Sequence, residues 1–402
     1  MASVAPSVEA VAPEGAADFL RFMGPAGDGR VGEVKGLFDW KNHPPVEQWR
    51  VEVGEGWSGF VVHGDRAVTQ EQRGELECVT CYELSSGKLL WLASNEGRFD
   101  EAMGGIGPRA TPVIDPEAGM VYTLGALGLL QCLDLADGSL RWKTNVLEVA
   151  GTSNLEWGKS AAPLLDQGRV IVSGGRGTPT LLAFDAKEGR ELWRSGEEGA
   201  TYSSPVLREL AGEMQIVSVN QGSVTGHDRD SGAVKWRFEW SGDFPKVCQP
   251  EPAGANRLLI TSSYGVDSHL IEITRGESGK WEAKSLWASG RLRTKFSSAS
   301  VVGDHAYALD EGRLVCVDLN NGERVWREGR YGYGQHLLCG KDTLLIQSEP
   351  GEVAVVRAQP EGWLELGRIE ALHFKTWNPP CLAGRWLLVR NDREAIAFLM
   401  AE

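Results

Sequence analysis

Short stretches in which apolar and polar residues alternate recur along nearly the whole chain, and turn residues separate them. Around Cys132, for example, Leu133 and Leu135 alternate with Asp134 and Ala136, as in a strand that is buried on one face. Long stretches with helical periodicity are few, and the chain contains 50 glycines. The pattern predicts an all-β protein of many short strands joined by tight turns.

One turn motif repeats in register. An acidic residue is followed after four positions by a glycine, and four positions later by a tryptophan. The copies are Glu83–Gly87–Trp91, Asp134–Gly138–Trp142, Asp185–Gly189–Trp193, Asp228–Gly232–Trp236 and Asp318–Gly322–Trp326. The carboxylate can accept bonds from nearby amides, and the glycine supplies a positive φ. We expect a hairpin whose tryptophan opens the next strand and fills space between neighbouring sheets.

A second series of segments gives the number of units. A small residue or proline followed by an apolar strand occurs eight times, from Ser58 to Asn378, and further strands follow each time. Trp287 and Trp326 are 39 residues apart and Trp91 and Trp142 are 51 apart, which suits four-stranded propeller blades of about 40–50 residues. The repeat predicts an eight-bladed β-propeller of four-stranded antiparallel blades.

The last unit lacks its tryptophan strand, because the chain ends soon after a third strand near 395–399. The segment 46–52, which contains Trp49, has the pattern of the missing strand. We expect this N-terminal strand to complete the C-terminal blade and close the ring, which removes two exposed sheet edges.

The domain organisation follows from this closure. Residues 46–402 are expected to form a single propeller, residues 19–45 a loop that packs on the ring, and residues 1–18 a disordered leader. Residues 1–15 have neither a basic start nor an apolar stretch, so no signal peptide is expected in this chain. No apolar run approaches the roughly 20 residues needed to span a bilayer, so no membrane span is expected.

Composition restricts the partners. The chain carries 41 Lys and Arg against 55 Asp and Glu, a net charge of −14, which disfavours nucleic acid as a partner. The seven cysteines stand mostly in strand-like apolar contexts and are expected to be reduced core residues. Cys78 and Cys81 have a metal-site spacing, but a three-residue step on a strand places their side chains on opposite faces. The histidines show no zinc spacing, so no metal site and no catalytic residue is predicted.

The acidic–glycine–tryptophan unit resembles the repeat of the pyrroloquinoline-quinone-type (PQQ-like) eight-bladed propellers, over about residues 46–400. That superfamily includes BamB-like outer-membrane assembly proteins and quinoprotein alcohol dehydrogenases. The resemblance implies a bacterial protein of the periplasm or another extracytoplasmic compartment. The chain departs from the dehydrogenases, because it has no adjacent cysteine pair and no Cys-x-x-Cys-His. Their calcium-binding and catalytic residues match no motif here.

The segments that precede the inner strands are the candidate functional site. They should emerge at one mouth of the central channel, and all eight carry an aromatic residue or a cation. Together they predict an anion site walled by aromatic rings. The alternative is that these are solvated loop cations beside packing aromatics. The candidate ligand-binding residues are Trp57, Arg109, Trp157, Lys159, Tyr202, Lys246, Lys295, Phe296, Tyr333, His336, Lys375 and Trp377.

Two functions remain open from these observations. The first is a non-catalytic binding or scaffold propeller, expected to be a monomer, which takes a small anionic ligand or a protein partner at the funnel mouth and requires no cofactor. The second is a PQQ-dependent oxidoreductase, in which the mouth cations meet the carboxylates of the cofactor.

Overall fold

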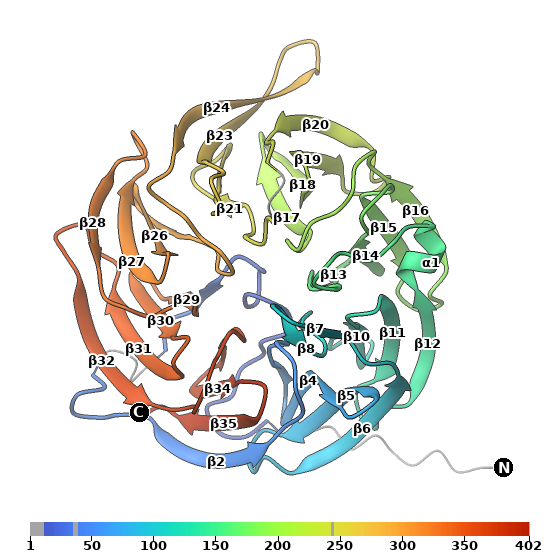
Figure 1. Cartoon of the computed structure of the whole chain (residues 1–402), viewed down its shortest axis with the longest axis vertical. Helices are drawn as coiled ribbons and strands as arrows, with labels where there is room; N and C mark the ends of the chain where they lie inside the picture. The colour runs from blue at the N-terminus through green and yellow to red at the C-terminus, as the bar shows by residue number, and fades with distance from the viewer. Residues whose placement is uncertain (1–11, 35–38, 243–244, 402) are drawn as a thin grey trace.

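The computed structural model describes residues 12–34, 39–242 and 245–401. Within this part of the chain, eight antiparallel sheets stand in a ring, each with one strand near the centre and one at the rim (Figure 1). The predicted eight-bladed β-propeller is confirmed. Seven sheets have four strands, and the sheet of β29–β32 gains a fifth, β1, parallel to its inner strand β29.

The first four blades consist, from the inner strand outward, of β3 (Val61–His63), β4 (Arg66–Arg73), β5 (Leu76–Glu83) and β6 (Leu89–Glu96); β9 (Val113–Asp115), β10 (Met120–Leu124), β11 (Leu129–Asp134) and β12 (Leu140–Asn145); β13 (Leu164–Asp166), β14 (Arg169–Ser173), β15 (Leu181–Asp185) and β16 (Glu191–Ser195); β17 (Val206–Leu210), β18 (Glu213–Val219), β19 (Ser223–Asp228) and β20 (Val234–Glu239).

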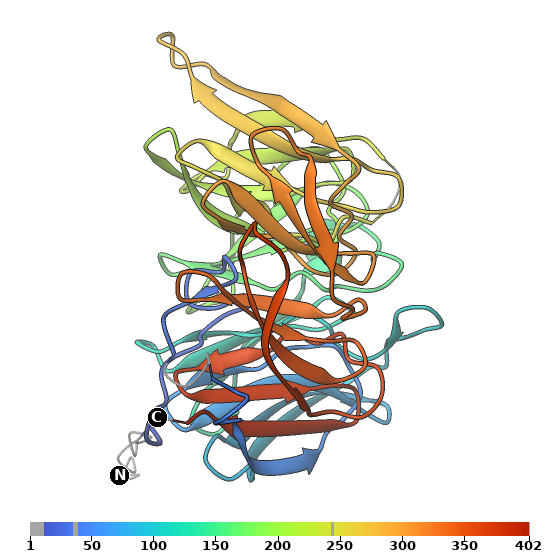
Figure 2. The same ribbon diagram turned by 90° about the vertical axis from the view of Figure 1, so that its left-hand side faces the viewer.

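The next three blades consist of β21 (Glu251–Pro252), β22 (Arg257–Ile260), β23 (Ser268–Arg275) and β24 (Trp281–Ser289); β25 (Ser300–Val302), β26 (His305–Asp310), β27 (Arg313–Asp318) and β28 (Arg324–Glu328); β29 (Gln335–Cys339), β30 (Thr343–Gln347), β31 (Glu352–Arg357) and β32 (Leu364–Glu370), with β1 (Arg30–Val31). Outside the blades lie the hairpin of β7 (Asp100–Glu101) and β8 (Gly105–Ile106) and the short helix α1 (Val146–Ala150). The long β23–β24 hairpin extends beyond its neighbours (Figure 2).

The last blade closes the ring as predicted. It consists of β33 (Cys381–Ala383), β34 (Trp386–Arg390), β35 (Glu394–Leu399) and, at the rim, the N-terminal strand β2 (Val46–Glu52). Strands β2 and β35 are antiparallel, and Trp49 is only 7% exposed. Its indole Nε1 donates to the carbonyl of Leu84 in the first blade at 2.7 Å, so the closing strand also joins the first and last blades.

The turn motif joins one blade to the next. All five motif glycines have φ between +69° and +75°. Each lies under the tryptophan of the preceding blade; a Cβ at Gly189 would lie 2.5 Å from the ring of Trp142. The Trp142 Nε1 donates to the carbonyl of Ala186 in the same turn at 2.9 Å. The spacing therefore repeats because the glycine turn of each blade leaves room for the tryptophan ring of the preceding blade to pack against it.

The N-terminal segment crosses the inner strands. Val62 in β3 and Leu338 in β29 donate backbone hydrogen bonds to Phe19 and Gly29, at 2.8 and 2.7 Å. Arg30 pairs with the buried Glu251 of β21 at 3.2 Å. The predicted disordered leader spans residues 1–18, of which 1–11 lie outside the described residues. Within the described part of this segment, the carbonyl of Glu14 accepts a hydrogen bond from Trp386 Nε1 at 3.2 Å.

The core lies within and between the sheets. All seven cysteines are buried and free, as expected from their apolar contexts. Among the described residues, no helix is both long and apolar enough to cross a membrane.

Candidate functional site

A cavity of about 430 Å³ lies at the centre of the ring, where the loops before all eight inner strands contribute side chains. The inner strands begin at this end of the channel, so the residues just before them point into one space. The cavity is lined by nine of the twelve predicted residues: Trp57, Arg109, Trp157, Tyr202, Lys295, Phe296, Tyr333, Lys375 and Trp377.

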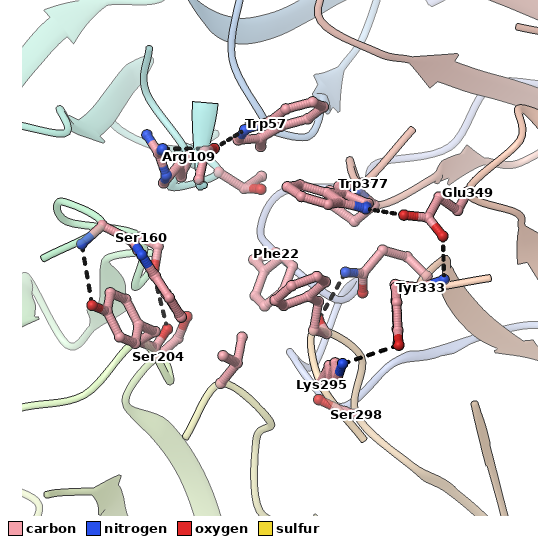
Figure 3. A pocket seen from close by; sticks show the side chains of 18 of the residues that line it. Phe22, Trp57, Arg109, Ser160, Ser204, Lys295, Ser298, Tyr333, Glu349 and Trp377 are labelled. Atoms are coloured by element: carbon pink, nitrogen blue, oxygen red, sulfur yellow. Dashed lines mark hydrogen bonds between the residues drawn. The ribbon is translucent and has the colours of Figure 1, made fainter. Parts of the chain in front are cut away.

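One wall of the cavity is a chain of aromatic rings. The ring centres of Trp57 and Trp377 are 5.0 Å apart, those of Trp377 and Phe296 5.0 Å, and those of Phe296 and Tyr333 5.9 Å. Phe22, from the N-terminal segment, also lines the cavity and projects toward its centre (Figure 3). Tilted and edge-to-face contacts of this kind are favourable, so the rings support one another and leave their remaining faces for an occupant.

A second pair of rings stands apart from this wall. Trp157 and Tyr202 are stacked with centres 5.3 Å apart, and the Tyr202 hydroxyl accepts a bond from the Trp157 amide at 3.2 Å. Both residues come from loops on the side of the ring that holds β13 and β17. The cavity therefore presents flat apolar surfaces from two sides.

Arg109 supports the loop of Gly104 and Gly105, which contacts Trp57 of the aromatic wall. Its guanidinium donates to the carbonyls of Gly104 and Gly105 at 2.8 Å each and lies 4.5 Å from the ring centre of Phe99. The Gly104 carbonyl also accepts from Trp57 Nε1 at 2.7 Å (Figure 3). Burial lowers the pKa of Arg109 to about 10. With a further bond to the Gly107 carbonyl, most of the Arg109 donors are engaged by backbone, which leaves few for an anionic ligand.

Lys295 and Lys375 differ in their surroundings. Lys295 Nζ donates to the Tyr333 hydroxyl at 3.0 Å and pairs with Glu311 at 3.3 Å. Burial alone would lower the pKa of Lys295, but the bond to Tyr333 and the charge of Glu311 raise it overall. Lys375 is exposed, and its ammonium lies 4.3 Å from the ring centre of Trp377. Lys375 is therefore the mouth cation best placed to meet an incoming anion.

An acidic residue that the sequence reasoning missed also lines the cavity. Glu349 accepts from Trp377 Nε1 at 2.8 Å and from the Tyr333 amide at 3.1 Å. It follows β30, the second strand of its blade, whereas the prediction considered only loops before the inner strands. Because antiparallel second strands end where inner strands begin, these turns reach the same mouth. That rule, applied to the sequence, would have found Glu349 and also Glu311.

Three of the predicted residues do not line the cavity. Lys159 is completely buried and donates to the carbonyl and hydroxyl of Ser173 at 2.8 and 2.7 Å. Lys246 is also fully buried, and its Nζ donates to the Gln221 carbonyl at 2.6 Å. Lys159 therefore bonds the end of β14, and Lys246 bonds the turn after β18, and neither side chain lines the cavity.

His336 is the third. Its ring is buried, and its Nε2 lies 3.1 Å from the Ser300 hydroxyl. Burial lowers the pKa of His336 to about 4, so the imidazole is neutral near pH 7. His336 lies on β29, contacts Ser300 of β25 in the neighbouring blade and does not line the cavity.

The cations that line the cavity are the groups that a PQQ cofactor would meet there. Among the described residues, no three His, Cys, Asp or Glu side chains are grouped to hold a metal ion. Arg109 is engaged by carbonyls and Lys295 by Glu311, so the carboxylates of a quinone cofactor would meet few unpaired cations.

Comparison with known proteins identifies relatives. The family profile described as outer membrane protein assembly factor BamB matches residues 79–328. The outer membrane protein assembly factor BamB of Shewanella oneidensis is 21% identical over 321 residues, which cover 77% of each chain. The quinohemoprotein alcohol dehydrogenase ADH-IIG of Pseudomonas putida is 23% identical, over 55% of this chain but only 32% of that protein.

Solved structures show the same fold. The crystal structure of BamB from Moraxella catarrhalis superposes with a TM-score of 0.65 at 15% identity, over 88% of this chain and 99% of that one.

Proposed function

The chain belongs to the family of the outer membrane protein assembly factor BamB, and from this membership we propose that it is a non-catalytic binding propeller. Its site is the funnel mouth, where it takes an anionic ligand or an anionic segment of a protein partner. The family also supports a location outside the cytoplasm, in the bacterial periplasm, and a role in holding partners together during assembly.

The observation that carries the proposal is the convergence of all eight loops on one aromatic cavity. Ligand sites combine apolar walls with a few placed polar groups, and this cavity has both. Three of its lining residues are cationic, Arg109, Lys295 and Lys375, against the single carboxylate Glu349. Lys295 is paired with Glu311 and Arg109 with backbone carbonyls, so the exposed Lys375 is the cation that favours an anionic group at the mouth.

The apolar walls refine this preference. An occupant that carries a flat ring can pack between Trp377 and the pair of Trp157 and Tyr202 while its negative group meets Lys375. Apolar burial then contributes most of the affinity, at roughly 25 cal/mol per Å² removed from water, and the lysine contributes orientation.

A fluorescent dye tests the site. Anilinonaphthalene sulfonate combines flat rings with one negative charge, and its fluorescence rises when it leaves water. We expect saturable binding to the protein that weakens strongly in Trp377→Ala. The matched control is Trp281→Ala, which removes a partly exposed tryptophan on the β23–β24 hairpin, outside the cavity. Equal loss in both variants, or none in either, would overturn the cavity as the site.

The same protein also tests the oxidoreductase alternative. PQQ with calcium is added, and dye reduction with alcohols or sugars as donors is followed. We expect no turnover. Sustained dye reduction that depends on PQQ would replace the binding function with an enzymatic one.

A further inference from the structure

The outer strands of several blades carry an arginine pattern that one blade breaks. In three blades, an arginine on the outer strand follows a glutamate three positions earlier and pairs with it. The pairs are Arg50 with Glu47 at 2.9 Å, Arg194 with Glu191 at 2.6 Å and Arg368 with Glu365 at 2.7 Å. On β28 the corresponding arginine is Arg327, and Arg324 stands where the glutamate would be.

This replacement concentrates positive charge between two neighbouring blades. Arg291 and Arg293 lie in the segment after β24, and Arg324 and Arg327 lie on β28, the rim strand of the adjacent blade (Figure 1). Three of them meet Asp310 at the end of β26: Arg293 Nε at 2.8 Å, Arg327 Nε at 2.9 Å and Arg324 Nη2 at 3.3 Å. Arg324 Nη2 also donates to the carbonyl of Arg291 at 3.4 Å. We call these four residues the arginine cluster.

One carboxylate does not balance this cluster. The Asp310 side chain is fully buried, and in the described part of the chain no other carboxylate pairs with Arg293, Arg324 or Arg327. Three guanidinium groups carry about 15 N–H donors, whereas a carboxylate offers about four acceptor sites. The Nε of Arg324 is buried and makes no hydrogen bond to any described residue. Burial lowers the pKa of Arg324, and its arginine neighbours lower it further against the pull of Asp310.

The cluster is open to solvent. The side chains of Arg293, Arg324 and Arg327 are 42%, 27% and 27% exposed, and Arg291 is exposed as well. Guanidinium groups that share a single partner and keep free, accessible donors are suited to bidentate recognition of an oxyanion.

We propose that Arg291, Arg293, Arg324 and Arg327 form a binding site for a phosphate group, separate from the funnel cavity. A dianion suits the site better than a second carboxylate, because four guanidinium charges against Asp310 leave an excess of three. The phosphate can be free or can belong to a larger molecule as a monoester. The site does not depend on the function proposed for the funnel.

Calorimetric titration of the whole protein at low ionic strength tests the proposal, because added salt screens exposed charges. Three probes are compared: inorganic phosphate, glycerol 3-phosphate and acetate. The decisive variant is Arg324→Glu, which restores the glutamate–arginine spacing of the other blades. We expect it to reduce phosphate affinity tenfold or more. The control, Arg194→Gln, removes the arginine that corresponds to Arg327 on another blade, where Glu191 neutralises it, and should leave the affinity unchanged.

The probes distinguish the source of the phosphate. Binding of both phosphates, lost in Arg324→Glu, supports the site and shows that free phosphate suffices. Binding of glycerol 3-phosphate alone, lost in the same variant, supports a site for a phosphomonoester. The proposal is overturned if neither phosphate binds at about 10 mM, where a site with a Kd of about 1 mM is mostly filled. Equal binding of acetate, or unchanged binding in Arg324→Glu, also overturns it.

A second variant covers the case in which Arg324→Glu folds poorly, as a melting curve would show. Arg291→Ala removes an exposed guanidinium that makes no ion pair with Asp310, so folding should be preserved. Phosphate affinity should still fall several-fold, and an unchanged affinity in this folded variant contradicts the proposal.

Discussion

Tryptophan has different roles at the rim of the ring and at the mouth of the funnel. Rim tryptophans such as Trp142 pack on a turn glycine of the next blade and donate to a carbonyl of that same turn, 2.9 Å away. Mouth tryptophans such as Trp377 contact other rings and a carboxylate, and leave one side to the cavity. The residue type is the same, so its surroundings decide its role. At the rim it is fixed by the repeat, and at the mouth it is available to an occupant.

Removal of a rim tryptophan is the strongest test of this contrast. Trp49→Ala deletes the buried ring that joins the last blade to the first, and we expect a loss of about 3–5 kcal/mol in the free energy of unfolding. Urea denaturation followed by circular dichroism measures it. Trp377→Ala, at the mouth, serves as the comparison and should cost much less. A loss below about 1 kcal/mol for Trp49→Ala would contradict its role in closure.

The glycine under a rim tryptophan gives a sharper test. Gly189 and Gly168 lie in the same blade with φ of +69° and +71°, so alanine is strained equally at both. A Cβ at Gly189 would lie 2.5 Å from Trp142, whereas a Cβ at Gly168 meets nothing within 4 Å. We expect Gly168→Ala to cost about 1 kcal/mol and Gly189→Ala about 1–3 kcal/mol more, from the steric conflict. Equal losses of unfolding free energy in the two variants would show that the close contact between Gly189 and Trp142 does not contribute to stability.

Lys159, which is buried within the propeller, and Lys375, which is exposed at the funnel mouth, should differ in how they affect the pH dependence of stability. Burial lowers the pKa of Lys159 from 10.5 to about 7. Between these values the unfolded chain binds more protons than the folded one, so this contribution to stability rises from pH 7 toward pH 10.5 and is lost as pH falls to 7.

The measurement is the change in Tm between pH 7 and pH 9. We expect this change to be more positive in the wild type than in Lys159→Met, by an amount on the order of a few degrees. Lys375→Ala, which removes an exposed lysine, should change with pH as the wild type does. Identical pH profiles for the wild type and Lys159→Met would show that Lys159 is charged in the folded state.

The smallest effect on stability is expected at the mouth. Lys375→Ala removes an exposed ammonium beside Trp377, so the Tm should stay nearly unchanged. Binding of anilinonaphthalene sulfonate should weaken by about fivefold or less, the equivalent of up to about 1 kcal/mol for an exposed charge. A marked fall in Tm would assign Lys375 to the fold rather than to the site.

The lining of the cavity was predictable in outline. The loops before the inner strands were visible because each precedes a recognisable strand, and nine of their residues do line the cavity. Lys159, Lys246 and His336 could not be separated from these, since one residue more or less along a loop turns a side chain into the blade. Phe22 gave no local signal, because its position depends on contacts of the N-terminal segment with strands far away in sequence.

The sequence by itself determined the strands, the number of blades and the closure by Trp49. These features depend on the spacing of residues close together in the chain, such as a glycine with positive φ four residues after an acid. Because that spacing recurs from blade to blade, it can be read directly from the sequence. Only the tertiary structure decided which cations meet solvent and which meet carbonyls, that Glu349 enters the cavity, and that Arg291 and Arg293 join Arg324 and Arg327. Those outcomes depend on how neighbouring blades face one another, because a charge is paired or left free by groups that the chain brings from another blade.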